Sequence, residues 1–236
     1  MKIVGAMVCG PGEADRWLED SLKDFKRLCD NAVIVTCNAT PKEKILIKKY
    51  GYWCYEDNRE WGKYQDQIKT DLLERICRLR ANWCLSLDAD ETVPTVTREI
   101  LEGLTTSRIS TYFYVVNLID SEETYSKPLS FWNVRFYQAP SPGNRRFQRT
   151  PLHCGSAPPI AWRQSPKDSY VPHILIHKGL MLQSDRLKKA ERYKLYDPEA
   201  KFKGRDYYDA LVAEIKPQEY NQEEVLKEIT AFCHDL

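Results

Sequence analysis

The first 90 residues alternate between short apolar runs and longer amphipathic stretches, and this alternation limits the fold more than any other feature. The apolar runs occupy residues 2–9, 32–37, 52–56 and 83–88. The amphipathic stretches, with apolar residues at helical spacing, occupy residues 13–28, 41–50 and 63–80. Continuous apolar strands that alternate with helices are typical of a parallel sheet covered on both faces. The sequence therefore predicts an α/β fold that begins β-α-β-α-β-α-β.

The pattern changes after Pro94. Apolar spacing predicts a helix around residues 96–104, and aromatic runs at residues 110–120 and 131–139 predict two long strands, expected to be antiparallel. A proline-rich loop is expected over residues 140–167, a strand over 169–179, and helices over 184–195 and 198–213. We predict one domain, residues 1–215, with halves at 1–94 and 95–215. Residues 216–236 read as a charged, weakly helical tail.

Composition excludes several classes of protein. The formal net charge of the 236 residues is +1, which does not suggest a nucleic-acid partner. No run approaches 18 apolar residues, so no membrane span is expected, and the N-terminus lacks a signal-peptide cleavage pattern. The eight cysteines form no CxxC pair, which favours reduced thiols and a cytoplasmic setting over disulfides or structural zinc.

Three acids directly follow the fourth apolar run. Asp88 and Asp90 are two residues apart, and Glu91 comes next. At a strand end this spacing places both aspartates on one side, where they repel each other unless a cation lies between them. Ligands in open α/β sheets bind beyond the carboxyl ends of the strands, and Mg²⁺ and Mn²⁺ prefer carboxylate oxygens. A solvated turn is the alternative interpretation.

The sequence "CLSLDADETVP" (84–94) resembles the strand and D-x-D segment of the family 2 glycosyltransferases, which have the GT-A fold. "REWGKYQDQIKTDLLERI" (59–76), the R-x-F segment within 130–153 and "PHILIHKG" (172–179) followed by "KKAERY" resemble further segments of that family, in its order. The resemblance covers about residues 2–211. It implies a Rossmann-like, mostly parallel sheet flanked by helices, with a smaller antiparallel acceptor-side part.

The resemblance implies metal-dependent transfer of a sugar from a nucleotide-sugar, most simply a UDP-sugar, with inversion at the anomeric carbon. Mn²⁺ or Mg²⁺ would bind Asp88 and Asp90, with His177 as a third ligand, and would neutralise the leaving diphosphate. His177 can equally be a structural residue at a strand end. The expected contacts to the nucleotide-sugar are Asn38, Asp57, Arg59, Gln65, Asp88 and Ala89.

An inverting transfer needs a base that takes the proton of the acceptor hydroxyl. The sequence offers Glu91, Asp120, Glu122, His153 and Asp168 without choosing among them. His153 precedes Cys154 where the family has His-Glu. The first strand is followed by "CGPGEADRW" in place of the family's P-x-Y-N, and the second by "TCNATPKEK" in place of its acidic stretch.

Two other functions stay open. A sugar nucleotidyltransferase would need a Gly-rich basic loop after the first strand, which "GPGEADRW" fits poorly. A catalytically inactive module that binds a glycan or a partner would have no reason to keep repelling acids together. The acceptor, a glycan or another hydroxyl compound, is not identified. Peripheral membrane contact would use the basic residues Arg186, Lys188, Lys189, Arg192 and Lys194, which a solvated helix face explains as well.

Overall fold

The computed structural model describes residues 1–106, 108–150, 154–162, 169–201 and 204–235. Eight strands form one sheet in the order β3-β2-β1-β4-β8-β6-β9-β5, and two short strands form a second sheet. The strands are β1 Ile3–Cys9, β2 Asn31–Cys37, β3 Trp53–Asp57, β4 Trp83–Ser86, β5 Glu91–Thr92, β6 Ser110–Asn117, β7 Thr124–Tyr125, β8 Phe131–Gln138, β9 Tyr170–His177 and β10 Gln218–Glu219.

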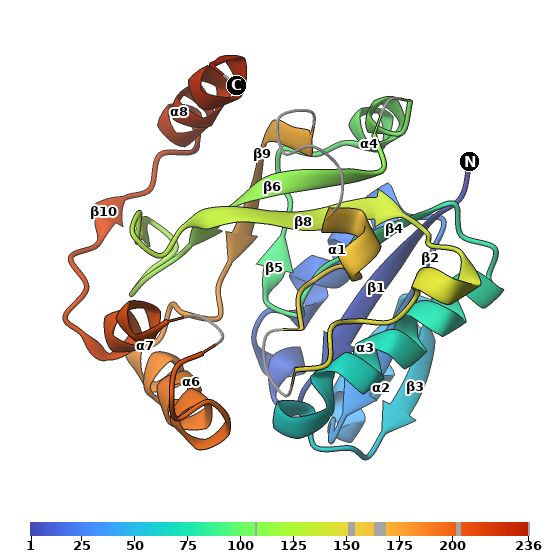
Figure 1. The fold of residues 1–236 in the computed structure, drawn as a ribbon, viewed down its shortest axis with the longest axis horizontal. Coiled ribbons are helices and arrows are strands. Elements are labelled where there is room, and N and C mark those ends of the chain that lie inside the picture. Colours follow the sequence, from blue (N-terminus) through green and yellow to red (C-terminus); the bar gives the residue numbers. More distant parts are fainter. Residues whose placement is uncertain (107, 151–153, 163–168, 202–203, 236) are drawn as a thin grey trace.

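Helices cover both faces of the large sheet (Figure 1). They are η1 Glu13–Asp15, α1 Leu18–Leu28, α2 Pro41–Lys49, α3 Trp61–Arg78, α4 Arg98–Leu104, η2 Pro142–Asn144, η3 Pro159–Trp162, α6 Gln183–Tyr196, α7 Arg205–Val212 and α8 Gln222–His234. One core lies between the sheet and helices α1, α2 and α4. The other lies under α3 and the segment that includes η3.

The predicted parallel half is confirmed. Strand β1 pairs in parallel with β2 and β4, and β2 pairs in parallel with β3. Strand β8 then joins antiparallel to β4 and to β6, which confirms the antiparallel pair expected over residues 110–139. The fold is therefore the expected α/β type: a mostly parallel sheet flanked by helices, with a smaller antiparallel part, as in GT-A folds.

Three predicted helices begin later than expected. The predicted helix 13–28 is divided into η1 and α1, because Gly12 adopts φ +85° and the loop amides of Gly12 and Ala14 donate to the Glu43 carboxylate. Helix α4 begins at Arg98, after an N-cap at Thr97, rather than near residue 96. Helix α7 begins at Arg205 rather than near 198.

Residues 216–235 pack onto the domain, whereas the sequence predicted a charged tail. Strand β10 pairs antiparallel with β7. Helix α8 buries Val225 and Ile229 against a cluster that includes Val116 and Ile174. Its polar face made the segment look solvated, but two apolar residues one helical turn apart are sufficient to seat it on the sheet.

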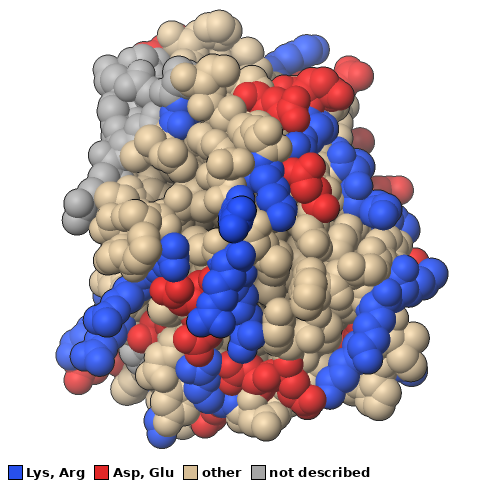
Figure 2. Space-filling view, turned by 90° about the vertical axis from the view of Figure 1, so that its right-hand side faces the viewer, with Lys and Arg blue, Asp and Glu red and all other residues tan. Residues whose placement is uncertain are grey.

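The surface view in Figure 2 shows basic and acidic side chains interspersed over that face of the molecule. This agrees with the near-zero net charge of the sequence. Among the helices that the structure describes, none combines the length and apolarity that crossing a bilayer requires. All eight cysteines are free thiols.

Candidate active site

A cleft of about 1030 Å³ opens at the carboxyl ends of the central parallel strands. Gly10 and Pro11, which follow β1, line it together with Asn38, which follows β2, and with the acids that follow β4. Strands β2 and β3 lie on one side of β1, and β4 lies on the other. The loops after β1 and β4 therefore diverge, and this switch point is where open α/β sheets bind ligands.

The acidic turn after β4 is held in place by α1. The Ser21 hydroxyl lies 2.9 Å from the carbonyl oxygen of Ala89 and 2.8 Å from that of Glu91. The Asp24 carboxylate accepts a hydrogen bond from the amide of Val93 at 2.6 Å. These contacts fix the backbone on both sides of Asp90, so its side chain is directed into the cleft by a rigid turn.

Asp90 and His177 lie side by side although 86 residues separate them. The Oδ2 atom of Asp90 is 3.3 Å from Nε2 of His177. The antiparallel pairing of Glu91 with His177 in strands β5 and β9 brings them together. Gly179 lies against both, since a Cβ atom there would be 2.0 Å from Asp90 Oδ2 and 2.8 Å from His177 Nε2. Only glycine leaves this space open.

The imidazole of His177 is oriented by Asn117. The Nδ2 group of Asn117 donates to the carbonyl oxygen of Leu129 at 2.6 Å, so its Oδ1 atom faces Nδ1 of His177. An amide oxygen only accepts hydrogen bonds, so Nδ1 carries the proton. In neutral imidazole the lone pair of Nε2 then points at a carboxylate oxygen. That arrangement is repulsive unless a proton or another cation lies between the two atoms.

These two side chains can hold a divalent metal. A carboxylate oxygen and an imidazole nitrogen are both acceptable ligands for Mn²⁺, which usually completes its shell with water and phosphate. Among the described residues, no group of three or more His, Cys, Asp or Glu side chains converges as a metal site. The geometry fits a metal site with two protein ligands, Asp90 and His177. Asp88 lies near them but does not complete the expected set of three ligands.

Asp88 and Glu91 face a buried arginine. Nη2 of Arg135 donates to Glu91 Oε1 and lies 3.4 Å from Asp88 Oδ2. Glu91 is 1% exposed and Arg135 is 4% exposed. Burial and the neighbouring Asp88 and Asp90 act to raise the pKa of Glu91, and the positive charge of Arg135 acts against them. Nε and Nη1 of Arg135 have no hydrogen-bond partner among the described residues.

Two lysines place positive charge near the aspartates. Burial raises the pKa of Asp88, but Arg135 and Lys69 outweigh it and the net pKa is lowered. Burial likewise raises the pKa of Asp90, and His177 and Lys189 outweigh it, so that the net pKa falls far below the usual range. Lys69 on α3 and Lys189 on α6 both line the cleft. Such a setting suits an anionic ligand that bridges the lysines and a metal.

Most of the other residues proposed from the sequence also line the cleft, but not all. Asn38, Gln65 and Ala89 do so. Asp57 and Arg59 do not; they pair with each other at 2.5 Å, and Arg59 also pairs with Asp71.

The sequence offered five candidate bases, and none of those that the structure describes is free in the cleft. Glu122 pairs with Lys178 at 2.8 Å, and Asp168 lies outside the described residues. The Glu91 carboxylate accepts hydrogen bonds from Arg135 and from the amide of Asp88. Asp120 lies outside the cleft, in a turn with φ +64°, where it pairs with Arg186 at 3.2 Å. His153 lies outside the described residues.

Sequence reasoning assigned no role to Arg135 or Glu13, and both line the cleft. The signal for Arg135 was the i, i+2 spacing of Phe131, Asn133 and Arg135 along one strand, which places all three on one face. Glu13 carried no signal, because an acid in a Gly-Pro-Gly loop looks solvated. Burial, and then the charge of Asp90, raise the pKa of Glu13 to about 7.

Comparisons with known proteins agree with the fold. No protein-family model and no curated protein sequence matches the chain. Among solved structures, TarS of S. aureus aligns with a TM-score of 0.51 at 11% identity, over 90% of this chain and 42% of TarS. The chain thus spans less than half the length of TarS.

Two further structures align less closely. One is a protein from Desulfovibrio desulfuricans G20 described as a nucleotide-diphospho-sugar transferase, with TM-score 0.42 at 9% identity, over 97% of this chain and 99% of that one. The other is 4-diphosphocytidyl-2C-methyl-D-erythritol synthase, with TM-score 0.41 at 12% identity, over 59% and 76%. At these identities the comparisons bear on the fold alone, and only the TarS alignment supports it here.

Proposed function

We propose that this chain is a metal-dependent glycosyltransferase that moves a sugar from a nucleotide-sugar, most simply a UDP-sugar, to a hydroxyl acceptor with inversion. The observation that carries the proposal is the Asp90–His177 pair, whose facing oxygen and nitrogen require a cation, at the switch point of the sheet. Lys69 and Lys189 supply further positive charge on the walls. A diphosphate bound to a divalent metal satisfies all of these groups.

Each residue has a task in this proposal. Asp90 and His177 hold the metal, which when bound neutralises charge on the departing diphosphate. Lys69 and Lys189 bind phosphate oxygens. Arg135, whose Nε and Nη1 atoms have no hydrogen-bond partner among the described residues, orients the sugar or the phosphate next to it. Glu91 positions Arg135 and the amide of Asp88, so we assign it a positioning role and not that of the base.

The nucleoside fits between the loop after β1 and the start of α3. Pro11, Asn38, Trp61 and Gln65 line that part of the cleft. Trp61 offers a ring on which a base can stack, and the amides of Asn38 and Gln65 can bond base or ribose edges. TarS has been solved with UDP and with UDP-GlcNAc, which makes UDP the first nucleotide to test.

Calorimetric titration tests the proposal. UDP, GDP and dTDP are titrated into the protein with and without Mn²⁺, then into Asp90→Ala and into Asp209→Ala, an exposed acid on α7 outside the cleft. We expect one nucleotide to bind only with Mn²⁺, to lose binding in Asp90→Ala and to keep it in Asp209→Ala. Failure of all three nucleotides to bind would overturn the proposal in favour of a binding module.

The reaction product separates two classes of transferase. A glycosyltransferase releases a nucleoside diphosphate, whereas a nucleotidyltransferase releases pyrophosphate from a nucleoside triphosphate. The loop after β1 places Glu13 rather than a basic residue beside the acidic turn, which disfavours a triphosphate there. We therefore expect UDP and not pyrophosphate as the product.

A further inference from the structure

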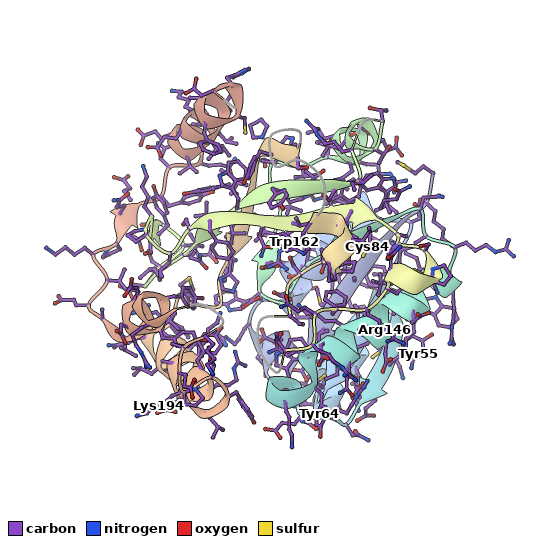
Figure 3. All side chains as sticks on the ribbon, viewed as in Figure 1. Tyr55, Tyr64, Cys84, Arg146, Trp162 and Lys194 are labelled. Carbon is purple, nitrogen blue, oxygen red and sulfur yellow. The ribbon has the colours of Figure 1, made fainter. Side chains whose placement is uncertain are left out.

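Aromatic rings line the part of the cleft next to β8. They are Phe131 and Trp132 on that strand and Trp162 at the end of η3. Trp162 is 39% exposed. Figure 3 shows it in the middle of the molecule, beneath β8. The exposed part of this large ring lines the cleft, so a ligand that stacks on it would bury further apolar surface.

Trp162 is held rigidly. Its Nε1 group donates to the carbonyl oxygen of Ala157 at 3.1 Å, and its ring meets Tyr112 edge-on at 5.5 Å between centroids. Gly155, at φ +89°, lies under it, since a Cβ atom there would be 3.8 Å from the indole. The ring is therefore already in place before any ligand arrives, so that little conformational entropy is lost on binding.

The Trp132 ring packs against aromatic side chains of α8 and β9. Its ring stacks on Phe232 of α8 at 5.6 Å and meets Tyr170 at 4.9 Å. Tyr170 in turn lies 5.0 Å from Tyr112, which contacts Trp162. The two cleft tryptophans thus belong to one connected aromatic cluster that extends from α8 to η3. Helix α8 braces one wall of the cleft through this cluster.

The polar groups beside these rings are uncharged. Asn133, Gln148 and Ser156 line the same part of the cleft. The Ser156 hydroxyl lies 2.8 Å from Oδ1 of Asn133. Amides and hydroxyls both donate and accept, as sugar hydroxyls require. Two of the cations that line the cleft each have a partner here, Arg135 with Glu91 and Lys69 with the carbonyl oxygen of Gly155 at 2.8 Å, and the proposed function assigns both of them to the donor.

We propose that the acceptor is a neutral sugar residue of a glycan, which stacks on Trp162 and bonds through its hydroxyls to the uncharged groups beside that ring. Apolar C–H faces of a pyranose ring match an indole face, while its rim of hydroxyls matches amides. This proposal rests on the proposed function, because it names the acceptor of the same reaction. It places the acceptor beside β8 and Trp162.

The test uses the full chain labelled with 5-fluorotryptophan, with UDP and Mn²⁺ present. The fluorine resonance of Trp162 is assigned by its loss in Trp162→Phe. Cellobiose, maltose and N,N′-diacetylchitobiose are the neutral probes, and 3′-sialyllactose is the anionic one. We expect at least one neutral disaccharide to shift the Trp162 resonance and leave that of Trp53 unmoved. Trp53 is the matched control, 51% exposed on β3 outside the cleft.

Affinity gives the second readout. Trp162→Ala should weaken the disaccharide about tenfold or more and leave UDP binding intact, whereas Trp53→Ala should change neither. Retained UDP binding shows that the variant is folded. The acceptor proposal is overturned if UDP binds but no neutral disaccharide moves the Trp162 resonance, or if only sialyllactose does. If UDP fails to bind the wild type, the proposed function falls, and the sugar shifts alone then decide whether the sugar site exists.

Discussion

Asp90 Oδ2 and His177 Nε2 lie 3.3 Å apart, and Gly179, which has no side chain, lies against both. Strand pairing between β5 and β9 creates this contact, and Asn117 decides which imidazole nitrogen faces the carboxylate. A carboxylate oxygen and an imidazole lone pair at this distance repel each other unless a cation lies between them. At neutral pH a metal can be that cation.

Gly179→Ala should abolish metal-dependent nucleotide binding. The added methyl group would lie 2.0 Å from Asp90 Oδ2, so the carboxylate has to turn away from His177. We expect Mn²⁺ affinity in the presence of UDP to fall about 100-fold, measured by calorimetry. Gly103→Ala is the matched control, because a Cβ atom there meets nothing within 4 Å. Unchanged affinity in Gly179→Ala would place the metal elsewhere.

Asn117→Ala should weaken the binding of the metal although Asn117 is not itself a proposed metal ligand. Loss of the Oδ1 acceptor frees the proton to move to Nε2, and we expect Mn²⁺ affinity to fall about 10- to 100-fold. Asn117→Asp keeps an acceptor for Nδ1 and should stay close to the wild type. Both variants also lose the bond to the Leu129 carbonyl, so any loss common to both comes from that bond and not from the tautomer.

Arg135→Met should separate stability from binding. It leaves the buried Glu91 without its partner, and we expect the free energy of unfolding to fall by about 3–5 kcal/mol. Adding Glu91→Gln removes the stranded charge and should restore most of that loss in urea denaturation. UDP binding should stay weak in both variants, because the cleft still lacks the arginine. A stable single variant would show that Glu91 is protonated beside it.

The parallel half of the fold could be predicted because each buried strand is a continuous apolar run bounded by turn residues. Helix α8 could not, since only Val225 and Ile229 are buried among thirteen mostly polar residues. The later helix starts are set by N-caps such as Thr97. In the sequence a cap is a weaker signal than the apolar spacing, which extends past it.

The residues of the candidate site likewise divide into those that the sequence could predict and those that it could not. The position of Asp88 and Asp90 in the cleft could be predicted, because a strand end next to two acids is visible within a short stretch of sequence. The Asp90–His177 contact depends on a strand pairing across 86 residues, and the contact of Glu91 with Arg135 is an ion pair across 44 residues, so no local pattern encodes either of them. Asp120 also reads as a candidate, yet its backbone turn points it toward Arg186.

Glu13→Gln should make the protein more stable at high pH. The pKa of Glu13 is raised from 4.5 to about 7 in the folded protein, so the folded state binds this proton more tightly than the unfolded state. Stability contributed by the protonated form is therefore full below pH 4.5 and is lost as the pH rises toward 7. At pH 8 we expect the free energy of unfolding of Glu13→Gln to exceed that of the wild type by about 1–3 kcal/mol.

Urea denaturation at pH 4 and pH 8 measures this difference. The two proteins should be equally stable at pH 4, where Glu13 is protonated in both states. Glu223→Gln, an exposed acid at the start of α8, should match the wild type at both pH values. A Glu13→Gln curve that shows the same gain at pH 4 would trace the effect to something other than titration.

Ile229→Asp should destabilise the whole domain. Ile229 is 5% exposed where α8 meets the sheet, and a carboxylate there has no cation beside it in the cluster it enters. We expect a loss of about 3 kcal/mol or more, seen as a lower midpoint in thermal unfolding. Lys227→Asp, an exposed position on the same helix, should change stability by no more than about 0.5 kcal/mol. Equal midpoints for both variants would mean that residues 216–235 behave in solution as the charged tail that their sequence suggests.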